Sequence, residues 1–340
     1  MTLNIGINGF GRIGRQAFRI AWNHPGVQVV HINDLVEPKV LAHLLKYDST
    51  YGTWDREIRA AGDRLIIDDH EVTVSAEKNP ADLPWADRHA QCVLESTGIF
   101  RKREQAAAHL EAGAERVLIS APGKNQLDGN FVIGVNEEMF APQQHRMFSI
   151  GSCTTNALAP MARVLQDRFG IRRALMTTVH AYTADQSLVD GPHRDLRRAR
   201  AAAANIIPTS TGAAKAISLI IPELEGRIDG MALRVPVLAG SIVDLTAELE
   251  QEVSAEQIND AFREVAGNRM KGVLTVAEAP LVSSDIVGTP FSCTLSPEDT
   301  YVVGGGLVKT LGWYDNEWGF SSRLVDMMGH VARTLEMSAA

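Results

Sequence analysis

The hydrophobic positions in the first 150 residues alternate between two spacings. Short continuous apolar runs, typical of buried strands, are separated by segments whose apolar residues recur every three or four positions, as in a helix. Strands are predicted at Leu3–Asn8, Val27–Asn33, Gln91–Glu95, Val117–Ile119, Phe131–Val135 and Met147–Gly151. Helices are predicted after Gly14 through about Trp22 and at Lys102–Ala112. Strands that alternate with helices predict an α/β fold of Rossmann type, with a doubly wound parallel sheet.

From Ala174 onward the strand-like runs lie closer together along the chain. They are Ala174–Tyr182, Gly230–Pro236, Ser241–Leu249, Val273–Ala277 and Thr300–Trp313. A helix is expected at about 254–267, opened by Ser254 and Gln257 as a capping box. A last helix is expected at roughly 318–336. This part of the chain predicts an α+β domain with a mainly antiparallel sheet.

A glycine motif follows the first predicted strand at once. Gly9, Gly11 and Gly14 form G-x-G-x-x-G where the strand ends and a helix begins. The three glycines permit a tight turn, close approach of the backbone to a pyrophosphate, and close packing of helix on strand. Asp34 ends the second strand, about twenty residues later, where a carboxylate accepts hydrogen bonds from a ribose. Together these features favour dinucleotide binding over a simple glycine-rich turn.

A lone cysteine lies where another strand gives way to a helix. Cys153 stands between the strand-like run Met147–Gly151 and the helical spacing of Ala157–Gln166. Free N–H groups at a helix N-terminus favour an anion and are expected to lower the pKa of the thiol. His180, on the run Ala174–Tyr182, could accept the thiol proton. The alternatives are a buried structural cysteine and a histidine satisfied within the core.

Composition limits the classes of partner and compartment. The chain has 340 residues and a formal net charge of -8, which opposes binding to nucleic acid and to anionic membranes. Cys92, Cys153 and Cys293 are an odd number without C-x-x-C spacing, so neither a disulfide framework nor a metal site is indicated. We expect a cytoplasmic protein, since the sequence shows no secretory leader and no long apolar run.

A dinucleotide site together with a thiolate and a histidine suits oxidation of an aldehyde through a thioester. Several motifs then make the chain resemble phosphorylating glyceraldehyde-3-phosphate dehydrogenase over nearly its whole length. They are Ser152–Asn156, His180–Thr183, Asn205–Lys215, Leu233–Pro236 and Trp313–Gly319. The resemblance implies reversible, NAD-dependent oxidative phosphorylation of glyceraldehyde 3-phosphate, the glycolytic reaction.

The resemblance also implies roles for individual residues. Cys153 matches the nucleophile and His180 its base, and two anion pockets surround them. Thr183 and Arg234 match the pocket for the phosphate of the substrate. The matches to the pocket for attacking inorganic phosphate are Ser152, Thr154, Thr211, Gly212 and Arg198. Arg197 and Arg200 are close enough in sequence to take the place of Arg198. Threonines that cap turns and an arginine in a surface ion pair are the alternatives.

On the cofactor side, the resemblance assigns residues at the ends of several strands. The matches are Gly9, Gly11, Arg12, Ile13, Gly14, Asp34, Lys78, Thr97, Ser120 and Asn316. Asp34 would repel the 2′-phosphate of NADP, so NAD is expected. Gly191 stands where NAD-preferring relatives usually have leucine, and the space it leaves would allow some use of NADP.

The resemblance implies a domain division and a homotetramer. Residues 1–152 form the NAD-binding domain, the C-terminal helix 317–340 packs back on it, and residues 153–316 form the catalytic domain. The long loop at about 183–205 is expected beside the cofactor of a neighbouring subunit. Erythrose-4-phosphate dehydrogenase, aspartate-semialdehyde dehydrogenase and a non-catalytic nucleotide-binding scaffold are the competing interpretations.

Overall fold

The computed structural model describes residues 2–339, which form two compact units. The first comprises the chain through Phe131, then Asn136–Gly151 and the segment from Ser321 onward; the second comprises Val132–Val135 and Ser152–Phe320. Residues 1 and 340, the outer limits of the predicted domains, lie outside the described residues. None of the helices within 2–339 has the length and apolar character needed to span a membrane.

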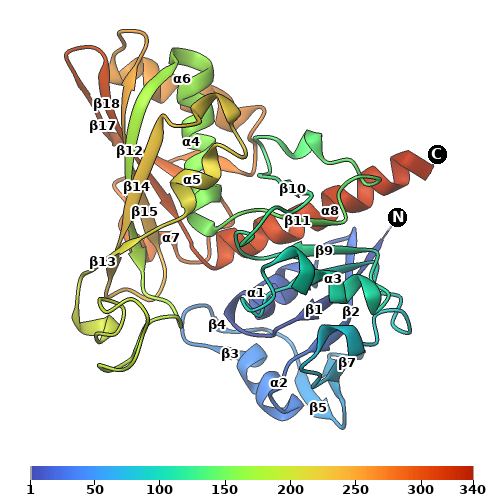
Figure 1. Cartoon of the computed structure of the whole chain (residues 1–340). Coiled ribbons are helices and arrows are strands. Elements are labelled where there is room, and N and C mark those ends of the chain that lie inside the picture. Colours follow the sequence, from blue (N-terminus) through green and yellow to red (C-terminus); the bar gives the residue numbers. More distant parts are fainter. Residues whose placement is uncertain (1, 340) are drawn as a thin grey trace. The chain divides into compact units, whose positions relative to one another are not determined.

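The first unit contains a sheet that is parallel over most of its width (Figure 1). Within the described residues its order is β10-β11-β9-β8-β1-β2-β7-β6-β5, and only β6 and β5 run antiparallel to their neighbours. The strands are β1 (Leu3–Asn8), β2 (Val27–Asn33), β5 (Ile58–Ala61), β6 (Arg64–Ile67), β7 (His70–Ser75), β8 (Cys92–Glu95), β9 (Arg116–Ile119), β10 (Gly129–Asn130) and β11 (Met147–Ser149). A separate hairpin pairs β3 (Tyr47–Asp48) with β4 (Gly52–Thr53).

Four helices are described in this unit. They are α1 (Arg12–Ala21), α2 (Pro38–Lys46), α3 (Arg103–Glu111) and, from Ser321, α8 (Trp318–Ala339), with short 3₁₀ turns η1 (Pro80–Asp82) and η2 (Glu137–Met139). Backbone bonds join the loops after β1, β8 and β9: Ser96 N donates to Asn8 O, and Ser120 N donates to Glu95 O. The carboxyl ends of these strands therefore form one edge, where such sheets bind ligands.

The second unit is built on a sheet with the order β13-β14-β12-β15-β18-β17-β16 among the described residues. Its strands are β12 (Ile171–Ala181), β13 (Ile207–Ser210), β14 (Ile228–Val235), β15 (Ser241–Leu249), β16 (Leu274–Val276), β17 (Cys293–Val303) and β18 (Leu307–Tyr314). Only β12–β14 and β16–β17 pair in parallel. The helical segments are α4 (Cys153–Phe169), α5 (Ala213–Ile217), α6 (Ala255–Gly267), α7 (Ser283–Ile286), η3 (Ala202–Ala204) and η4 (Pro222–Leu224).

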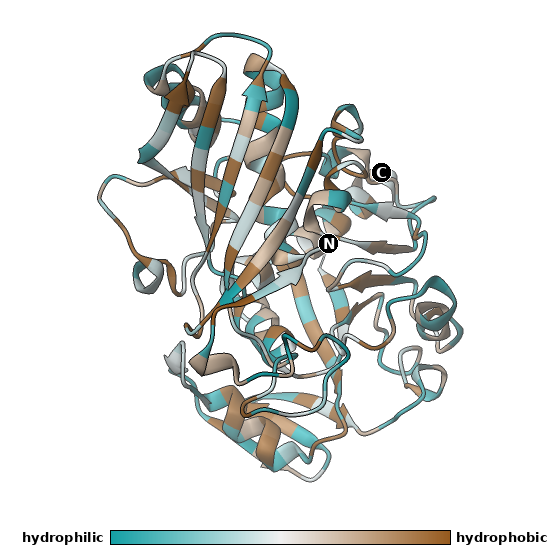
Figure 2. Ribbon diagram, turned by 60° about the vertical axis from the view of Figure 1, so that its left-hand side comes forward, coloured by the Kyte–Doolittle hydropathy of each residue, from teal (hydrophilic) through white to brown (hydrophobic). Residues whose placement is uncertain are grey.

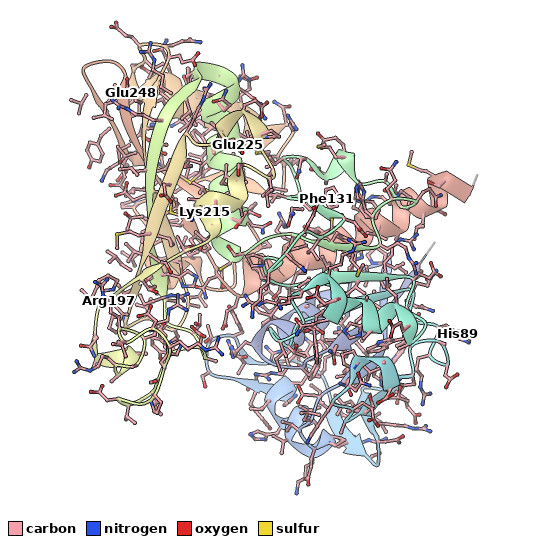
Figure 3. All side chains as sticks on the ribbon, viewed as in Figure 1. His89, Phe131, Arg197, Lys215, Glu225 and Glu248 are labelled. Carbon is pink, nitrogen blue, oxygen red and sulfur yellow. The ribbon has the colours of Figure 1, made fainter. Side chains whose placement is uncertain are left out.

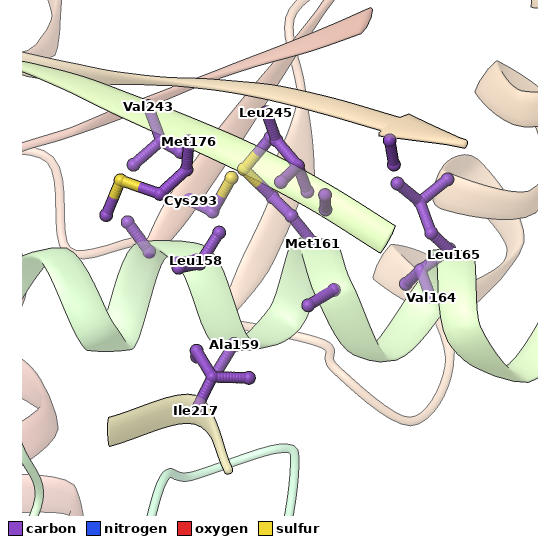
Figure 4. Close-up of a cluster of buried hydrophobic side chains, with 14 of the residues drawn as sticks. Leu158, Ala159, Met161, Val164, Leu165, Met176, Ile217, Val243, Leu245 and Cys293 are labelled. Atoms are coloured by element: carbon purple, nitrogen blue, oxygen red, sulfur yellow. The ribbon is translucent and has the colours of Figure 1, made fainter. Parts of the chain in front are cut away.

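The core of the second unit lies between α4 and this sheet. Figure 4 shows Leu158 and Met161 of α4 beneath Met176, Val243 and Leu245, and all five side chains are buried. The long strands carry alternating hydrophobic and hydrophilic residues (Figure 2), and β15 alternates between buried and half-buried positions throughout. This alternation places every second side chain of β12 and β15 on the helix-covered face.

The fold class and the capping box at Ser254 agree with the sequence analysis, while two strand predictions are wrong. The predicted strand Phe131–Val135 is a turn with Gly134 at φ +84, and only Gly129–Asn130 pair with the sheet. The predicted strand Thr300–Trp313 is two strands, because Gly304 and Gly305 adopt φ +58 and +75 and reverse the chain. Left-handed backbone of this kind is accessible to glycine without strain.

Candidate active site

Cys153 is the first residue of α4 and follows a capped helix terminus. Ser152 is the N-cap residue, and its hydroxyl accepts a hydrogen bond of 3.1 Å from Thr155 N. The hydroxyl also lies 2.8 Å from Thr155 Oγ1. These contacts fix the first turn of α4 and thereby the direction of the Cys153 side chain.

His180 and Arg234 reach the same place from adjacent strands. The parallel pairing of β12 with β14 aligns His180 with Arg234, and both side chains lie on the side of the sheet where α4 begins. Cys153 Sγ is 3.3 Å from His180 Nε2. His180 Nδ1 lies 2.6 Å from Ala181 O and 2.9 Å from Arg234 Nη1. The carbonyl only accepts and the guanidinium only donates, so the two contacts favour opposite tautomers of the imidazole. With the proton on Nδ1, Nε2 accepts the thiol proton.

Burial is the largest influence on the pKa values of both Cys153 and His180. It raises the pKa of the Cys153 thiol, although Arg234, Thr154 and the helix backbone oppose the rise. The lowered thiol pKa expected from the helix terminus alone is therefore wrong for this structure. Burial, reinforced by the charge of Arg234, lowers the pKa of His180 to about 3. The imidazole is consequently neutral at pH 7, with an unprotonated nitrogen, although so low a pKa makes it a weak base.

Two arginine side chains, Arg234 and Arg198, bring positive charge to this unit's candidate site. Arg234 Nη1 donates to Ala181 O at 3.0 Å and lies 3.5 Å from Thr183 Oγ1. The buried Nε of Arg234 has no hydrogen-bond partner within residues 2–339, so it is an available donor. Arg198 is held by Asp185 and by Thr209 Oγ1, at 3.0 Å from its Nε.

The neighbouring arginines of the 183–205 loop point elsewhere. Arg197, labelled in Figure 3, is exposed, and Arg200 pairs with Asp190. Arg198 instead directs Nη2 at Ser210 O, 3.4 Å away, next to Thr211 and Gly212. Of the three arginines that the sequence left open, Arg198 is the one that contacts Thr209 and Ser210, the residues directly before Thr211 and Gly212.

Tyr314 and Ser241 hold groups of the site from β18 and β15. Tyr314 OH lies 2.9 Å from Thr154 Oγ1 and 2.7 Å from Thr178 Oγ1, so the hydroxyl of Thr154 already has a buried partner. Ser241 Oγ accepts from Ala181 N and donates to Asn316 Oδ1 at 2.9 Å. With Oδ1 occupied in this way, the Nδ2 group of Asn316 is oriented to donate to another acceptor.

The glycine turn of the first unit has the close contacts that its sequence predicts. Gly9 has φ +91, and a Cβ there would lie 2.7 Å from Thr97 N. A Cβ on Gly14 would lie 2.2 Å from Gly9 O, whereas one on Gly11 would meet nothing within 4 Å. The turn is therefore tightly packed at Gly9 and Gly14 and open at Gly11. The open side lies at the N-terminus of α1, as a pyrophosphate site requires.

Carboxylates fix the neighbourhood of this turn. Asp34 accepts from Phe10 N at 2.7 Å and from Val36 N at 3.0 Å, which leaves lone pairs for a ribose hydroxyl. Asp48 accepts from Arg12 Nη1 at 2.5 Å. The remaining predicted cofactor residues are partly buried or exposed near the strand ends: Ile13, Lys78, Thr97 and Ser120.

Comparison with known proteins agrees with both units. Residues 3–103 match the model of the glyceraldehyde 3-phosphate dehydrogenase NAD binding domain, and residues 152–316 match that of the C-terminal domain. Glyceraldehyde-3-phosphate dehydrogenase 1 of Bacillus subtilis is 53% identical over 333 residues, which are 98% of this chain and 99% of the relative. The Geobacillus stearothermophilus enzyme is 52% identical over 332 residues, with the same shares. The Thermotoga maritima enzyme is 53% identical over 326 residues, 95% of this chain and 97% of its own.

The chain belongs to the glyceraldehyde-3-phosphate dehydrogenase family. Its cofactor is NAD. The turn at Gly9–Gly14, which is tightly packed at its two ends and open at Gly11, fits the pyrophosphate of a dinucleotide. In this family member, sequence reasoning missed Asp48, Tyr314 and Ser241. Each contacts a predicted site residue from a distant part of the chain. No local pattern marks Asp48 or Ser241, and Tyr314 lies in the Trp313–Gly319 motif without a role of its own.

Proposed function

We propose that the protein catalyses reversible oxidative phosphorylation of glyceraldehyde 3-phosphate to 1,3-bisphosphoglycerate. The observation that carries this proposal is the 3.3 Å contact between Cys153 Sγ and His180 Nε2, with Arg234 beside the same imidazole. A thiol next to a neutral histidine is a nucleophile with its own base. The identity of half or more to enzymes named glyceraldehyde-3-phosphate dehydrogenase supports this substrate.

In this proposal Cys153 and His180 move one proton and one acyl group. His180 Nε2 takes the thiol proton as Sγ bonds to the aldehyde carbon, and the proton passes to the carbonyl oxygen to give a thiohemiacetal. His180 takes the hydroxyl proton back as the hydrogen on that carbon leaves as hydride, and a thioester on Cys153 remains. The chemistry supplied by bound NAD is acceptance of this hydride. The backbone N–H of Cys153 is a second donor for the developing oxyanion.

Two anion pockets complete the proposed reaction. Arg234 and Thr183 would hold the phosphate of the substrate, and the unpartnered Nε of Arg234 supports this role because it offers a buried donor. The residues proposed to hold attacking phosphate are Ser152, Thr154, Thr211, Gly212 and Arg198. An oxygen of that phosphate attacks the thioester carbonyl, and Cys153 Sγ leaves as thiolate.

For NAD, we propose the set of ligands that the resemblance to the family implies. They are Gly9, Gly11, Arg12, Ile13, Gly14, Asp34, Lys78, Thr97, Ser120 and Asn316. Asp34 would disfavour the 2′-phosphate of NADP, while Gly191 leaves room for some NADP use. Domain limits of 1–152 with helix 317–340, and 153–316, are part of the same proposal.

A homotetramer and a cytoplasmic location are further parts of the proposal. The outward face of the second sheet exposes large apolar side chains, among them Leu175, Met231 and Tyr301, which suits burial against other copies of the chain. The three cysteines are unpaired in the structure, as is usual in a reducing compartment.

Initial rates of NADH formation from glyceraldehyde 3-phosphate test the proposal, measured with NAD or NADP and with or without inorganic phosphate. Strong turnover that requires both NAD and phosphate is expected. Cys153→Ser should abolish turnover while NAD binding by calorimetry is retained. Substantial turnover by Cys153→Ser, or faster oxidation of erythrose 4-phosphate by the unmodified enzyme, would count against the assignment.

A further inference from the structure

A buried acidic side chain outside the catalytic pair lies at the edge of the first sheet. Glu95, the last residue of β8, is 1% exposed. One oxygen accepts from Asn8 Nδ2 at 2.6 Å and lies 3.0 Å from His109 Nε2. The other accepts from Thr97 N at 2.9 Å and from Thr97 Oγ1 at 2.5 Å. None of these four donors is a lysine or arginine.

Trp85 decides which nitrogen of His109 carries the proton. Its indole Nε1–H, a donor only, points at His109 Nδ1 from 3.0 Å, so Nδ1 must accept. His109 therefore carries its proton on Nε2 and donates to Glu95. Trp85 and His109 are both 0% exposed, so this end of the hydrogen-bond chain is buried. With four donors directed at it, Glu95 acts as an acceptor at both of its oxygens.

The same carboxylate is connected to the glycine turn through its immediate neighbours. Thr97 N is the atom that a Cβ on Gly9 would approach to 2.7 Å, so the Thr97 backbone is packed against that glycine. Ser96 Oγ donates to Gly9 O at 2.6 Å. A displacement of Thr97 would therefore move Gly9 and the turn above it.

Asn8 extends the network across the carboxyl ends of the central strands. Its Oδ1 accepts from Asn33 Nδ2 at 2.8 Å, and Asn33 Oδ1 accepts from Ser75 Oγ at 2.8 Å. Asn33 immediately precedes Asp34, the proposed ribose ligand. Strands β1, β2, β7 and β8 are thus joined by side chains directly below the loops that would bind the cofactor.

A fully satisfied polar network in a core fixes geometry more than it adds stability, because every member must keep its position to keep its partners. We propose that Glu95, held by His109 and Trp85, is a positioning residue for NAD binding that acts through Thr97 and Gly9. This inference rests on the proposed use of the glycine turn for NAD. Glu95 itself does not contact the cofactor in this proposal.

Glu95→Gln tests the proposal with the least change in shape. Each oxygen of Glu95 accepts from two donors, so the new amide N–H must oppose donors whichever way the amide turns. We expect the Kd for NAD, measured by calorimetry on the full chain, to rise about tenfold, which corresponds to about 1.4 kcal/mol. Cys92→Ala is the matched control, since Cys92 is fully buried on the same strand, and its Kd should equal that of the unmodified protein.

Three further measurements test how Glu95 acts. If Glu95 acts through Thr97, the double variant Glu95→Gln/Thr97→Val should bind NAD no more weakly than the weaker single variant. Neutron diffraction from crystals of the unmodified protein should place the His109 proton on Nε2. Trp85→Phe, which keeps an aromatic ring, should weaken NAD binding about threefold, or about 0.65 kcal/mol. This variant provides the test if Glu95→Gln does not fold.

Unchanged NAD affinity in both Glu95→Gln and Trp85→Phe would overturn the proposal, as would additive effects in the double variant or a His109 proton on Nδ1. Failure of the unmodified protein to bind NAD would instead refute the proposed cofactor site. The neutron result would still test the proton arrangement in that case, so the two failures are distinguishable.

Discussion

Asp48→Asn should weaken both the first unit and its hold on the cofactor. The Asp48 side chain is 1% exposed and accepts from Arg12 Nη1 at 2.5 Å and Gln16 Nε2 at 2.9 Å. Its other oxygen accepts from Thr50 N at 2.9 Å and Tyr51 N at 3.1 Å. The asparagine keeps one acceptor oxygen, and its NH₂ group opposes the donors on the other side.

The loss in free energy of unfolding is estimated from two lost hydrogen bonds to the Asp48 carboxylate. Arg12 is 31% exposed and can turn partly to water, so we expect a loss of about 2–3 kcal/mol, below the usual cost of breaking a fully buried pair. For a unit of this size this lowers Tm by about 5–10 °C. Because Arg12 loses its anchor, the Kd for NAD should rise about fivefold, or about 1 kcal/mol.

The stability effect has a definite dependence on pH. Burial raises the pKa of the Asp48 carboxyl, but the backbone N–H groups of Thr50 and Tyr51 and the Arg12 guanidinium outweigh it, so this pKa lies below its ordinary value. A lowered folded-state pKa gives stability that is present above the unfolded pKa of about 3.9 and is lost as pH falls through the folded value. The difference in Tm between the unmodified protein and Asp48→Asn should be constant above about pH 5 and should become smaller below about pH 4.

Thermal unfolding from pH 7.5 to 3, with calorimetry of NAD at pH 7.5, measures these effects. Asp68→Asn is the control, because the Arg56–Asp68 pair is about one-third exposed and surface pairs contribute little. A Tm for Asp48→Asn equal to that of Asp68→Asn, or a Tm difference that does not narrow in acid, would show that Asp48 does not hold Arg12 as an ionised partner.

Three further substitutions test other contacts. Arg234→Leu should raise the KM for glyceraldehyde 3-phosphate more than tenfold, or more than about 1.4 kcal/mol, and leave NAD affinity unchanged; an unchanged aldehyde KM removes it from the substrate pocket. Ser241→Ala frees the side chain of Asn316, so kcat should fall about tenfold with Cys153 alkylation unaffected, and an unaltered kcat would contradict this. Gly240→Ala places a Cβ 2.1 Å from a backbone oxygen at φ +85 and should lower Tm by several degrees, unlike Gly267→Ala, whose Cβ meets nothing within 4 Å.

The parts of the molecule predicted correctly are those set by neighbouring residues. The turn at Gly9–Gly14 and the capping box at Ser254 depend on a few adjacent side chains and backbone angles. The parallel and antiparallel sheets follow from the spacing of apolar runs, which sets the length of each connection. These features can be predicted from the sequence because the residues that cause them lie within the same short segment.

The parts missed depend on residues brought together by the fold. The Asp48–Arg12 contact spans 36 positions and the Thr154–Tyr314 contact spans 160. The polarity of a side chain does not reveal such a partner. The thiol pKa was mispredicted for the same reason, since the helix terminus at Cys153 is local while the packing that buries the sulfur is not.

The catalytic pair shows how both kinds of cause combine. Local sequence fixes Cys153 at the start of α4, but His180 reaches it only because β12 pairs in parallel with β14 and antiparallel with β15. That register also sets Arg234 beside the imidazole, where its charge helps to lower the pKa of His180 to about 3. So low a pKa keeps His180 neutral at pH 7 but also makes it a weak base. The base strength of the site is therefore a property of the strand register, and a shift of one residue in β14 would turn Arg234 to the opposite face.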